Sequence, residues 1–412
     1  VYNSIIVDIR DKEYFEKAGY KMKYDATRKT TVDAWREFRN KCSKRALVIM
    51  PVQTGELREF AIKNNLFVLN LNKELGDAGA GQNISLLEEV LAWLEPNAPV
   101  YGWEQGVSED QFVARVSKSG HPMIPCDWSY NHSLLSLLYE KGREQVLPRI
   151  FDPRSIDFKK KKNFVSFFLS DGDNIQWMMQ DFASRYYDVP EAEDVKMTFG
   201  LPVATLAMMA PVQFNNLMGL QKQNCSLMEM LGGGYYYVDT YSQDNNRKTN
   251  LRVAAKRLAV SMRQYQIKLL GIMAMDVKSE AAKEAYQVYV DANDQLEGIV
   301  VLQYSPYAGG EGEVFWVTNK AGYDIPVITV KYSLWDRIHE REGSPDFIAS
   351  KLKEEAQEES FSVVCVHAWS RFEGDTYGAS AAKRCAERLD DRFEAINMQE
   401  LVWRLRMSGL FE

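Results

Sequence analysis

Two aspartates are the residues of this chain best suited to acid–base chemistry. Asp171 and Asp173 are separated by one glycine and follow the apolar run Phe164 to Leu169, which is typical of a buried strand. Side chains at positions i and i+2 of extended backbone point to the same side, so the two carboxyl groups could share acid–base work. Asp173 or Asn174 could instead cap a helix that begins at Ile175. Asp171 lies too early to act as that cap, and the pattern therefore favours it as a catalytic carboxylate.

Other polar side chains follow other apolar runs. His367 and Asp276 come directly after strand-like segments, and Glu311 follows another one at a greater distance. Because the carboxyl ends of parallel strands meet at one rim, we expect these groups to converge with the aspartate pair. His367 would orient a substrate hydroxyl group or tune the pair, although a lone histidine is also common as a structural residue.

Aromatic side chains are frequent near the same predicted rim. A flat ring offers apolar area and a negative face to the polarised C–H groups of a sugar. The side chains predicted to bind substrate are Tyr235, Tyr237, Tyr304, Tyr307, Tyr332, Trp369, Asn174 and Lys331. Carboxyl groups and aromatic rings together predict a site for a polar, ring-shaped ligand.

The apolar runs that must position these residues indicate an α/β protein of two domains. Residues 1–155 are predicted to form a small N-terminal α/β domain with a linker, and residues 156–412 the second domain. Strands are expected in the first domain at Ser4 to Asp8, Arg45 to Met50, Leu66 to Leu71 and Pro99 to Tyr101. A proline-containing segment follows and ends in the lysine run 159–162, which marks the junction.

The second domain has the size and rhythm of a barrel. Its strands are expected at Phe164 to Leu169, Lys196 to Phe199, Tyr235 to Val238, Lys268 to Met275, Gly298 to Gln303, Pro326 to Lys331, Phe361 to His367 and Phe393 to Ile396. Roughly 250 residues with such alternation predict a (β/α) barrel-like domain. The run Tyr235 to Val238 follows three glycines and could be a loop, so seven to eight strands are expected. A doubly wound open sheet is the alternative.

One cluster in the linker is expected to reach the same rim. Asp127, Trp128 and Asn131 lie in the segment between the two domains. Ligand sites often lie between domains, so we expect these side chains near Asp171.

Composition excludes several function classes. The 412 residues carry 50 basic and 57 acidic side chains, a net charge of −7, which argues against a nucleic-acid partner. No apolar run reaches the roughly 18 residues of a membrane-spanning helix. The five cysteines form no CxxC pair and the four histidines lack metal-ligand spacing, so we expect no metal or other cofactor. Cys365 is interpreted as a core residue. Nothing in the sequence predicts the oligomeric state.

The most unusual string of the chain runs from Gly232 to Val238 and reads GGGYYYV. There the chain resembles the family of glycoside hydrolases named for the motif GxGYxYP, with Val238 in place of the final proline. Three further segments also resemble the C-terminal domain of that family, and residues 1 to about 155 resemble its N-terminal domain. These segments are Ser170 to Asn174 (SDGDN), His367 to Trp369 (HAW) and Asn397 to Arg404.

The resemblance implies a protein that hydrolyses sugar polymers and is secreted or periplasmic. Because Val1 rather than Met opens the chain, we expect that a segment upstream was removed. A carbohydrate is then the expected ligand.

Three functions follow from the residues and the resemblance together. The leading hypothesis is a glycosidase with Asp171 as one catalytic carboxyl group and Asp173, Asp276 or Glu311 as the other. The second is metal-assisted hydrolysis, such as polysaccharide deacetylation, in which Asp171, Asp173 and His367 would hold a divalent metal. The third is a carbohydrate-binding protein without catalysis.

Overall fold

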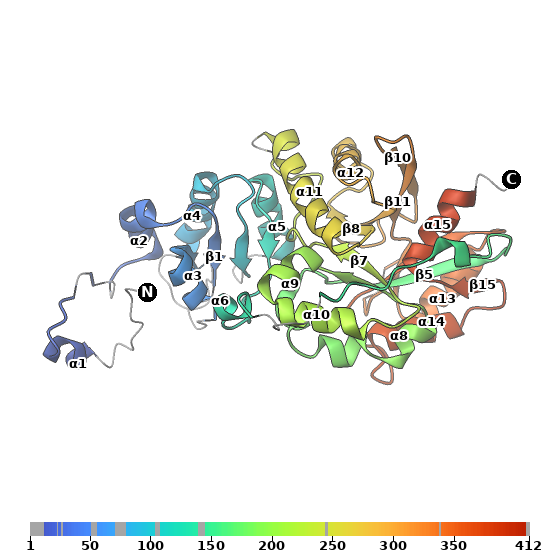
Figure 1. Ribbon diagram of the computed structural model, residues 1–412, viewed down its shortest axis with the longest axis horizontal. Coiled ribbons are helices and arrows are strands. Elements are labelled where there is room, and N and C mark those ends of the chain that lie inside the picture. Colours follow the sequence, from blue (N-terminus) through green and yellow to red (C-terminus); the bar gives the residue numbers. More distant parts are fainter. Residues whose placement is uncertain are drawn as a thin grey trace.

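The computed structural model describes residues 12–22, 24–25, 28–50, 56–70, 80–103, 108–138, 145–243, 246–337 and 339–408. Two sheets organise the described chain (Figure 1), one small and parallel and one large and curled. The predicted mixed α/β fold is therefore confirmed. The strand expected at Ser4 to Asp8 lies outside the described residues.

The small sheet has four parallel strands in the order β2-β1-β3-β4. Its strands are β1 (Leu47–Ile49), β2 (Phe67–Leu69), β3 (Val100–Gly102) and β4 (Met123–Ile124). The helices of this part of the chain are α1 (Lys12–Lys17), α2 (Thr31–Phe38), α3 (Arg58–Asn64), α4 (Ala80–Trp93) and α5 (Glu109–Lys118), with the 3₁₀ turn η2 (Arg39–Lys41). β4 was not predicted from the sequence, because it has only two residues and lies between Pro122 and Pro125.

The large sheet contains eleven strands, and its central strands are parallel. They are β5 (Asn163–Leu169), β6 (Thr198–Leu201), β7 (Ser226–Met230), β8 (Leu269–Ala274), β9 (Gly298–Gln303), β10 (Val314–Thr318), β11 (Asp324–Thr329), β12 (Tyr332–Leu334), β13 (Glu342–Gly343), β14 (Phe361–Val366) and β15 (Phe393–Ala395). The order is β10-β11-β9-β8-β7-β6-β5-β14-β12-β13, and β15 pairs with β5.

One continuous segment makes this sheet barrel-like. β11 pairs with β9 and β12 pairs with β14, and only Val330 and Lys331 lie between β11 and β12. The Val330 N–H donates to the Val301 carbonyl (3.2 Å), and the Lys331 N–H donates to the Val363 carbonyl (2.9 Å). The segment from β11 to β12 therefore pairs with β9 on one side and with β14 on the other. The order around the curled sheet is β5, β6, β7, β8, β9, the β11–β12 segment and β14.

Helices cover the outside of the curled sheet. In Figure 1, α11 and α12 lie above the sheet, and α8, α10 and α14 lie below it. The helices between α5 and the C-terminus are α6 (His132–Leu135), α7 (Ile175–Met178), α8 (Pro190–Asp194), α9 (Val203–Met209), α10 (Pro211–Leu220), α11 (Arg247–Gln264), α12 (Glu280–Ala292), α13 (Pro345–Glu354), α14 (Gly378–Glu387) and α15 (Met398–Ser408), with the 3₁₀ turn η3 (Pro153–Ser155) and the π-helix η4 (Ala183–Tyr187).

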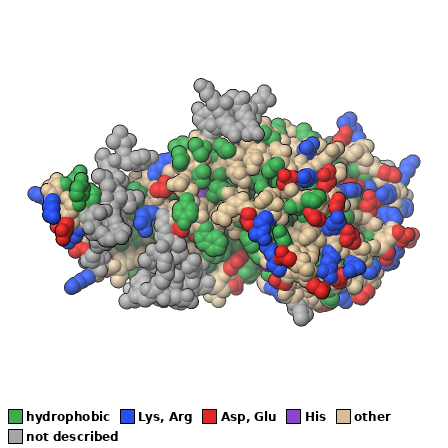
Figure 2. All heavy atoms as spheres, turned by 90° about the horizontal axis from the view of Figure 1, so that it is seen from below, with side chains coloured by type: hydrophobic (Ala, Val, Ile, Leu, Met, Phe, Trp, Pro, Cys, Tyr) green, Lys and Arg blue, Asp and Glu red, His purple; other side chains and the backbone are tan. Residues whose placement is uncertain are grey.

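The face seen from below in Figure 2 carries charges of both signs over the C-terminal half. Hydrophobic side chains gather near the middle of this face. Among the described residues, no helix is long and apolar enough to cross a membrane.

The glycine-tyrosine motif lies between the two sheets and is paired to both. Tyr235 forms an antiparallel bridge with Met123 of β4, and Tyr237 forms a parallel bridge with Met273 of β8. The expected strand at Tyr235 to Val238 is thus reduced to isolated bridges. The strand that pairs with β6 and β8 in the large sheet is instead β7, which lies before the glycines in the sequence. Tyr235 and Tyr237 belong to one hydrophobic core that also contains residues of the small sheet and of the barrel interior.

Gly234 is required by this double pairing. Its φ is +107°, and a Cβ there would lie 2.5 Å from the Cβ of Pro122. A Cβ at Gly233, the preceding residue, would have no other atom within 4 Å. The motif therefore approaches β4 more closely than a side chain at position 234 would allow.

We expect Gly234→Ala to destabilise the protein by on the order of 1–3 kcal/mol, because the variant combines a strained φ with a steric clash. The shift of the urea unfolding midpoint measures this loss. Gly233→Ala is the matched control and should leave the midpoint nearly unchanged. Equal midpoints for the two variants would contradict the close approach.

Candidate functional site

A pocket of ≈ 310 Å³ opens where the two sheets face each other. Its lining combines carboxyl groups, aromatic rings and a few apolar side chains. The lining residues are Trp103, Glu109, Pro125, Asp127, Trp128, Asp171, Asp173, Asn174, Gln176, Met230, Leu231, Tyr235, Met273, Tyr307 and Trp369.

The carboxyl ends of strands from both sheets deliver these side chains. In the small sheet, Trp103 follows β3 and Asp127 follows β4. In the large sheet, Asp171 follows β5, Tyr307 follows β9 and Trp369 follows β14. Because ligands of α/β proteins bind at strand carboxyl ends, this convergence marks the pocket as the candidate functional site.

Asp171 is held in a defined orientation at the end of β5. Its φ of +64° is unusual for a residue other than glycine. The Nε1–H of Trp369 donates to Asp171 Oδ1 (2.9 Å), and the Ser170 hydroxyl also donates to this carboxylate. Ser170 Oγ in turn accepts from the Ala368 N–H (3.2 Å). The ends of β5 and β14 therefore fix the carboxylate together.

Asp173 and Asn174 continue the same loop. Burial raises the pKa of Asp173 well above its usual value, and the neighbouring charges of Asp171 and Glu109 add to the rise. Asn174 caps α7, because its side chain accepts from the Trp177 N–H (3.2 Å). The capping role expected for this loop thus falls to Asn174, and the Asp173 carboxyl group lines the pocket.

Glu109 is a pocket residue that the sequence analysis did not single out. It is the first residue of α5, and its Oε1 accepts a hydrogen bond from the Tyr235 hydroxyl (2.9 Å). Desolvation raises the pKa of Glu109, the hydrogen bond from Tyr235 opposes this rise, and the charge of Asp171 adds to it. No sequence motif marks Glu109, because Tyr235 and Asp171 lie more than 60 residues away along the chain.

The linker cluster reaches the pocket as expected for two of its members. Asp127 and Trp128 line the pocket, whereas Asn131 is not among the lining residues. Gln176 of α7 joins them to the barrel: it donates to Asp127 Oδ1 (3.1 Å) and accepts from the Trp128 N–H (2.7 Å). The Trp128 side chain stays 60% exposed.

His367 lies beside the pocket and not in its lining. Its ring stacks on Trp335 at a centroid distance of 4.0 Å, and Tyr307 packs against it edge-on at 6.2 Å. His367 Nδ1 lies 2.8 Å from the Ser370 hydroxyl. Burial lowers the pKa of His367, against the opposing effect of the Asp171 charge. His367 can therefore influence the pocket through Tyr307 and Asp171.

The remaining predicted site residues lie elsewhere. Asp276 is exposed and accepts from the Lys278 N–H (2.9 Å), and Glu311 is exposed in a turn with φ +59°. Lys331 forms an ion pair with Glu355 (3.7 Å). Tyr332 is fully buried. Asp276, Glu311, Lys331 and Tyr332 are thus not brought into the pocket, whereas Asp171, Asp173, Asn174, Tyr235, Tyr307 and Trp369 are.

Two further tyrosines pack next to the pocket residue Tyr235, directly or through one another. Tyr237 is fully buried and meets the Tyr235 ring edge-on at 5.7 Å. Tyr304 packs against Tyr237 at 5.5 Å. Neither belongs to the lining. Cys365 is fully buried, which agrees with its interpretation as a core residue.

The described residues offer no cluster for a metal. No group of three or more His, Cys, Asp or Glu side chains in the described parts of the chain is arranged to hold a metal ion.

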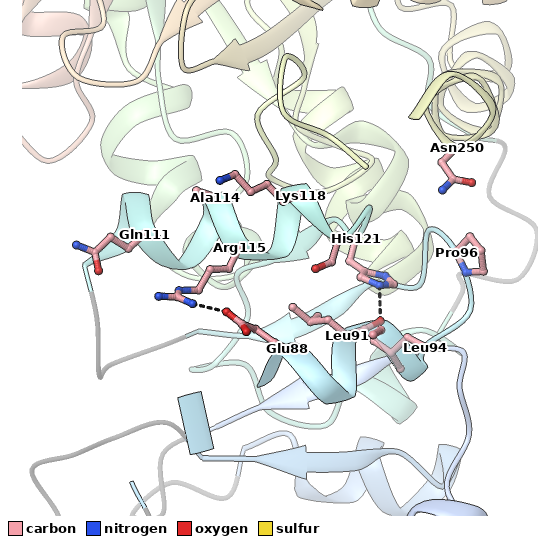
Figure 3. Close-up of a pocket in the computed structure, with 12 residues that line it drawn as sticks. Glu88, Leu91, Leu94, Pro96, Gln111, Ala114, Arg115, Lys118, His121 and Asn250 are labelled. Carbon is pink, nitrogen blue, oxygen red and sulfur yellow. Dashed lines mark hydrogen bonds and ion pairs between the residues drawn. The ribbon is translucent and has the colours of Figure 1, made fainter. Parts of the chain in front are cut away.

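A larger hollow of ≈ 780 Å³ lies beside α4 and α5, with Asn250 of α11 also in its wall (Figure 3). Arg115 and Glu88 at its wall form an ion pair (2.6 Å). Both ring nitrogens of His121 lie 3.0 Å from backbone carbonyl groups, of Ala98 and Leu91. These polar groups already have partners within the protein, and the hollow contains none of the predicted site residues.

Comparison with known proteins agrees with this architecture. Residues 161–406 match the GxGYxYP putative glycoside hydrolase C-terminal domain, and residues 44–137 match the GxGYxYP third domain. The chain therefore belongs to the GxGYxYP putative glycoside hydrolase family. No curated protein matches the chain in sequence.

One solved structure is similar to this chain along almost its full length. It is the crystal structure of a putative hydrolase from Bacteroides thetaiotaomicron VPI-5482, with a TM-score of 0.78 and 18% sequence identity. The alignment covers 97% of this chain and 73% of the other. At this identity the similarity establishes the shared fold.

A buried glutamate lies next to the first glycine of the motif. Glu229 of β7 is 0% exposed and accepts a hydrogen bond from the Ala204 N–H (2.9 Å). A Cβ on Gly232 would lie 1.8 Å from Glu229 Oε1, so the first glycine of the motif leaves room for this side chain. Burial raises the pKa of Glu229 to about 8, partly offset by backbone donors.

The raised pKa of Glu229 predicts a pH-dependent stability. Between its ordinary pKa of 4.5 and about 8, the folded chain keeps the Glu229 proton whereas the unfolded chain has lost it. This side chain therefore lowers the free energy of unfolding as pH rises through that window. We expect Glu229→Gln, which stays neutral, to lose less stability than the wild type between about pH 5 and pH 8, by on the order of a few kcal/mol.

Urea unfolding at several pH values measures the difference. The exposed Glu358 provides the control, because Glu358→Gln should follow the wild-type pH dependence. A Glu229→Gln variant that also followed the wild-type curve would show that Glu229 does not bind a proton on folding.

Proposed function

We propose that this chain is a glycoside hydrolase that cleaves an oligosaccharide or polysaccharide in the pocket between its two sheets. The observation that carries the proposal is that Asp171 and Asp173 line one pocket with Trp103, Trp128 and Trp369. Aromatic rings suit the C–H faces of sugars, and carboxyl groups are what glycosidic cleavage needs. Membership of the GxGYxYP family supports the same class of reaction.

The reaction needs one ionised and one protonated carboxyl group. Asp171 is the ionised one in this proposal, because two donors, Trp369 Nε1–H and the Ser170 hydroxyl, hydrogen-bond its carboxylate. It acts as the nucleophile or as the base that activates water. Asp173 and Glu109 both meet the requirement for an acid, since the surroundings raise the pKa of each. Asp173 is one of the three carboxyl groups, with Asp276 and Glu311, that the sequence indicates as the partner of Asp171.

Wild-type protein is first tested against a panel of oligosaccharides and aryl glycosides for release of reducing sugar or phenol. We expect turnover of at least one sugar, and Asp171→Asn should then lower kcat by about 10³-fold with little change in KM, because a catalytic carboxylate acts mainly on the transition state.

Asp276→Asn tests the alternative carboxylate that the sequence analysis also named. Because Asp276 lies outside the pocket, we expect less than a twofold change in kcat. An equal loss in both variants would place Asp276 in the reaction instead. A wild type that binds sugars but cleaves none would contradict the hydrolase and favour a carbohydrate-binding protein.

A further inference from the structure

The pocket receives carboxyl groups from two different domains. Asp171 and Asp173 stand two residues apart on the loop after β5 of the large sheet. Glu109 starts α5, whose buried side chains share a hydrophobic core with β1 and β3 of the small sheet. The three side chains line the same pocket, so the small domain completes the set of carboxyl groups.

The origin of these carboxyl groups bears on which of them acts as the acid and which as the nucleophile or base. The acid must reach the leaving oxygen while the nucleophile or base acts at the anomeric carbon, so the two groups flank the bond. Two neighbours on one loop are poorly placed to do so, whereas a group that enters from the other domain approaches the pocket independently of Asp171. Glu109 and Asp127 are the two pocket carboxyl groups that come from the small-sheet side. Asp127 Oδ1 accepts from the side-chain amide of Gln176 (3.1 Å), whereas Glu109 is held by the Tyr235 hydroxyl of the motif (2.9 Å).

The hydroxyl group that holds Glu109 is itself firmly fixed. Tyr235 is 3% exposed, and its ring stacks on Trp103 at 6.5 Å with an interplanar angle of 15°. Its backbone pairs with Met123 in both directions, with N···O distances of 2.6 and 3.0 Å. The Tyr235 hydroxyl thus orients the Glu109 carboxyl group (2.9 Å). Glu109 as a residue is exposed, while its carboxyl group is partly desolvated.

We propose that Glu109 is the general acid of the hydrolysis, acting opposite Asp171, and that Tyr235, the first tyrosine of the family motif, is its positioning residue. This inference rests on the proposed function. In the reaction the bond between C1 and the glycosidic oxygen breaks, its electron pair goes to that oxygen, and the oxygen takes the Glu109 proton. C1 gains a bond to a water that Asp171 deprotonates, or to the Asp171 carboxylate. In the second case water then attacks C1, Glu109 takes the proton of that water, and the bond between C1 and Asp171 breaks.

Several titratable groups influence Glu109. They come from its own helix, from the β5 loop, from the motif and from the segment after β9, and are Asp110, Asp171, Asp173, Tyr235, Tyr237, Tyr304 and Tyr307. The nearby carboxylate charges favour a protonated Glu109, and the Tyr235 hydrogen bond favours its ionised form.

Leaving-group dependence separates Glu109 from Asp173 as the acid. A 2,4-dinitrophenyl glycoside of the sugar that the wild type releases needs no proton on its leaving oxygen, whereas the corresponding oligosaccharide does. Glu109→Gln should therefore lose about 10²–10⁴-fold in kcat on the oligosaccharide and less than tenfold on the dinitrophenyl glycoside. Asp171→Asn should lose activity on both substrates.

A pH profile tests the role of Tyr235. In Tyr235→Phe the ionised form of Glu109 loses a hydrogen bond, so its pKa rises and the acid keeps its proton to higher pH. The alkaline limb of kcat/KM should move up by about 0.5–1 pH unit. Tyr236→Phe is the matched control, since the Tyr236 hydroxyl contacts Tyr289 and not Glu109, and its alkaline limb should stay at the wild-type pH.

The outcomes distinguish this inference from the proposed function. If Asp173→Asn showed the leaving-group dependence and Glu109→Gln did not, Asp173 would be the acid and the inference would be overturned while the hydrolase stood. The same holds if Tyr235→Phe and Tyr236→Phe kept identical profiles. A wild type that cleaves no glycoside overturns both.

Discussion

The architecture depends on the backbone pairing of the glycine-tyrosine motif with both sheets. Tyr235 exchanges two hydrogen bonds with Met123 of β4, and the Val238 N–H donates to the Met273 carbonyl of β8 (2.9 Å). This short segment fixes the small sheet against the barrel rim. Because the strand ends of both sheets then meet, residues after β3, β4, β5, β9 and β14 can line one pocket. Glu109 and Trp103 of the small-sheet region thereby line the same pocket as the β5 loop.

The electrostatics of the pocket follow from its position between the sheets. Four carboxyl groups, those of Glu109, Asp127, Asp171 and Asp173, line it, and none of the described lining residues is lysine, arginine or histidine. Desolvation raises the pKa of Asp127, Asp173 and Glu109. Asp171 accepts hydrogen bonds from an indole N–H and a hydroxyl group. Desolvated carboxyl groups and one carboxylate that two donors orient thus line the same pocket.

Local pattern predicted much of the fold and the part of the site that lies on a single loop. The continuous apolar runs gave β5, β8, β9 and β14 nearly to the residue, because buried parallel strands need no polar alternation. β7 was missed, since the buried Glu229 interrupts its apolar run. Asp171 and Asp173 were recognisable from their position after β5. Glu109 was not, because its partner Tyr235 lies 126 residues along the chain and only the docking of the two domains joins them. Asp276 and Glu311 also follow strands, but turn geometry directs them outside the pocket.

The departure of this chain from the family motif has a physical consequence at the same interface. Where the motif GxGYxYP ends in proline, this chain has Val238. Proline has no N–H, so it could not make the hydrogen bond that Val238 donates to Met273. The valine side chain is buried (1% exposed) and packs into the main core. The substitution therefore replaces the conformational restriction of a proline by one hydrogen bond and one apolar contact, and the bridge between motif and β8 is retained. The position of Tyr235, and with it that of Glu109, then depends on the glycines and the backbone pairing more than on the final residue of the motif.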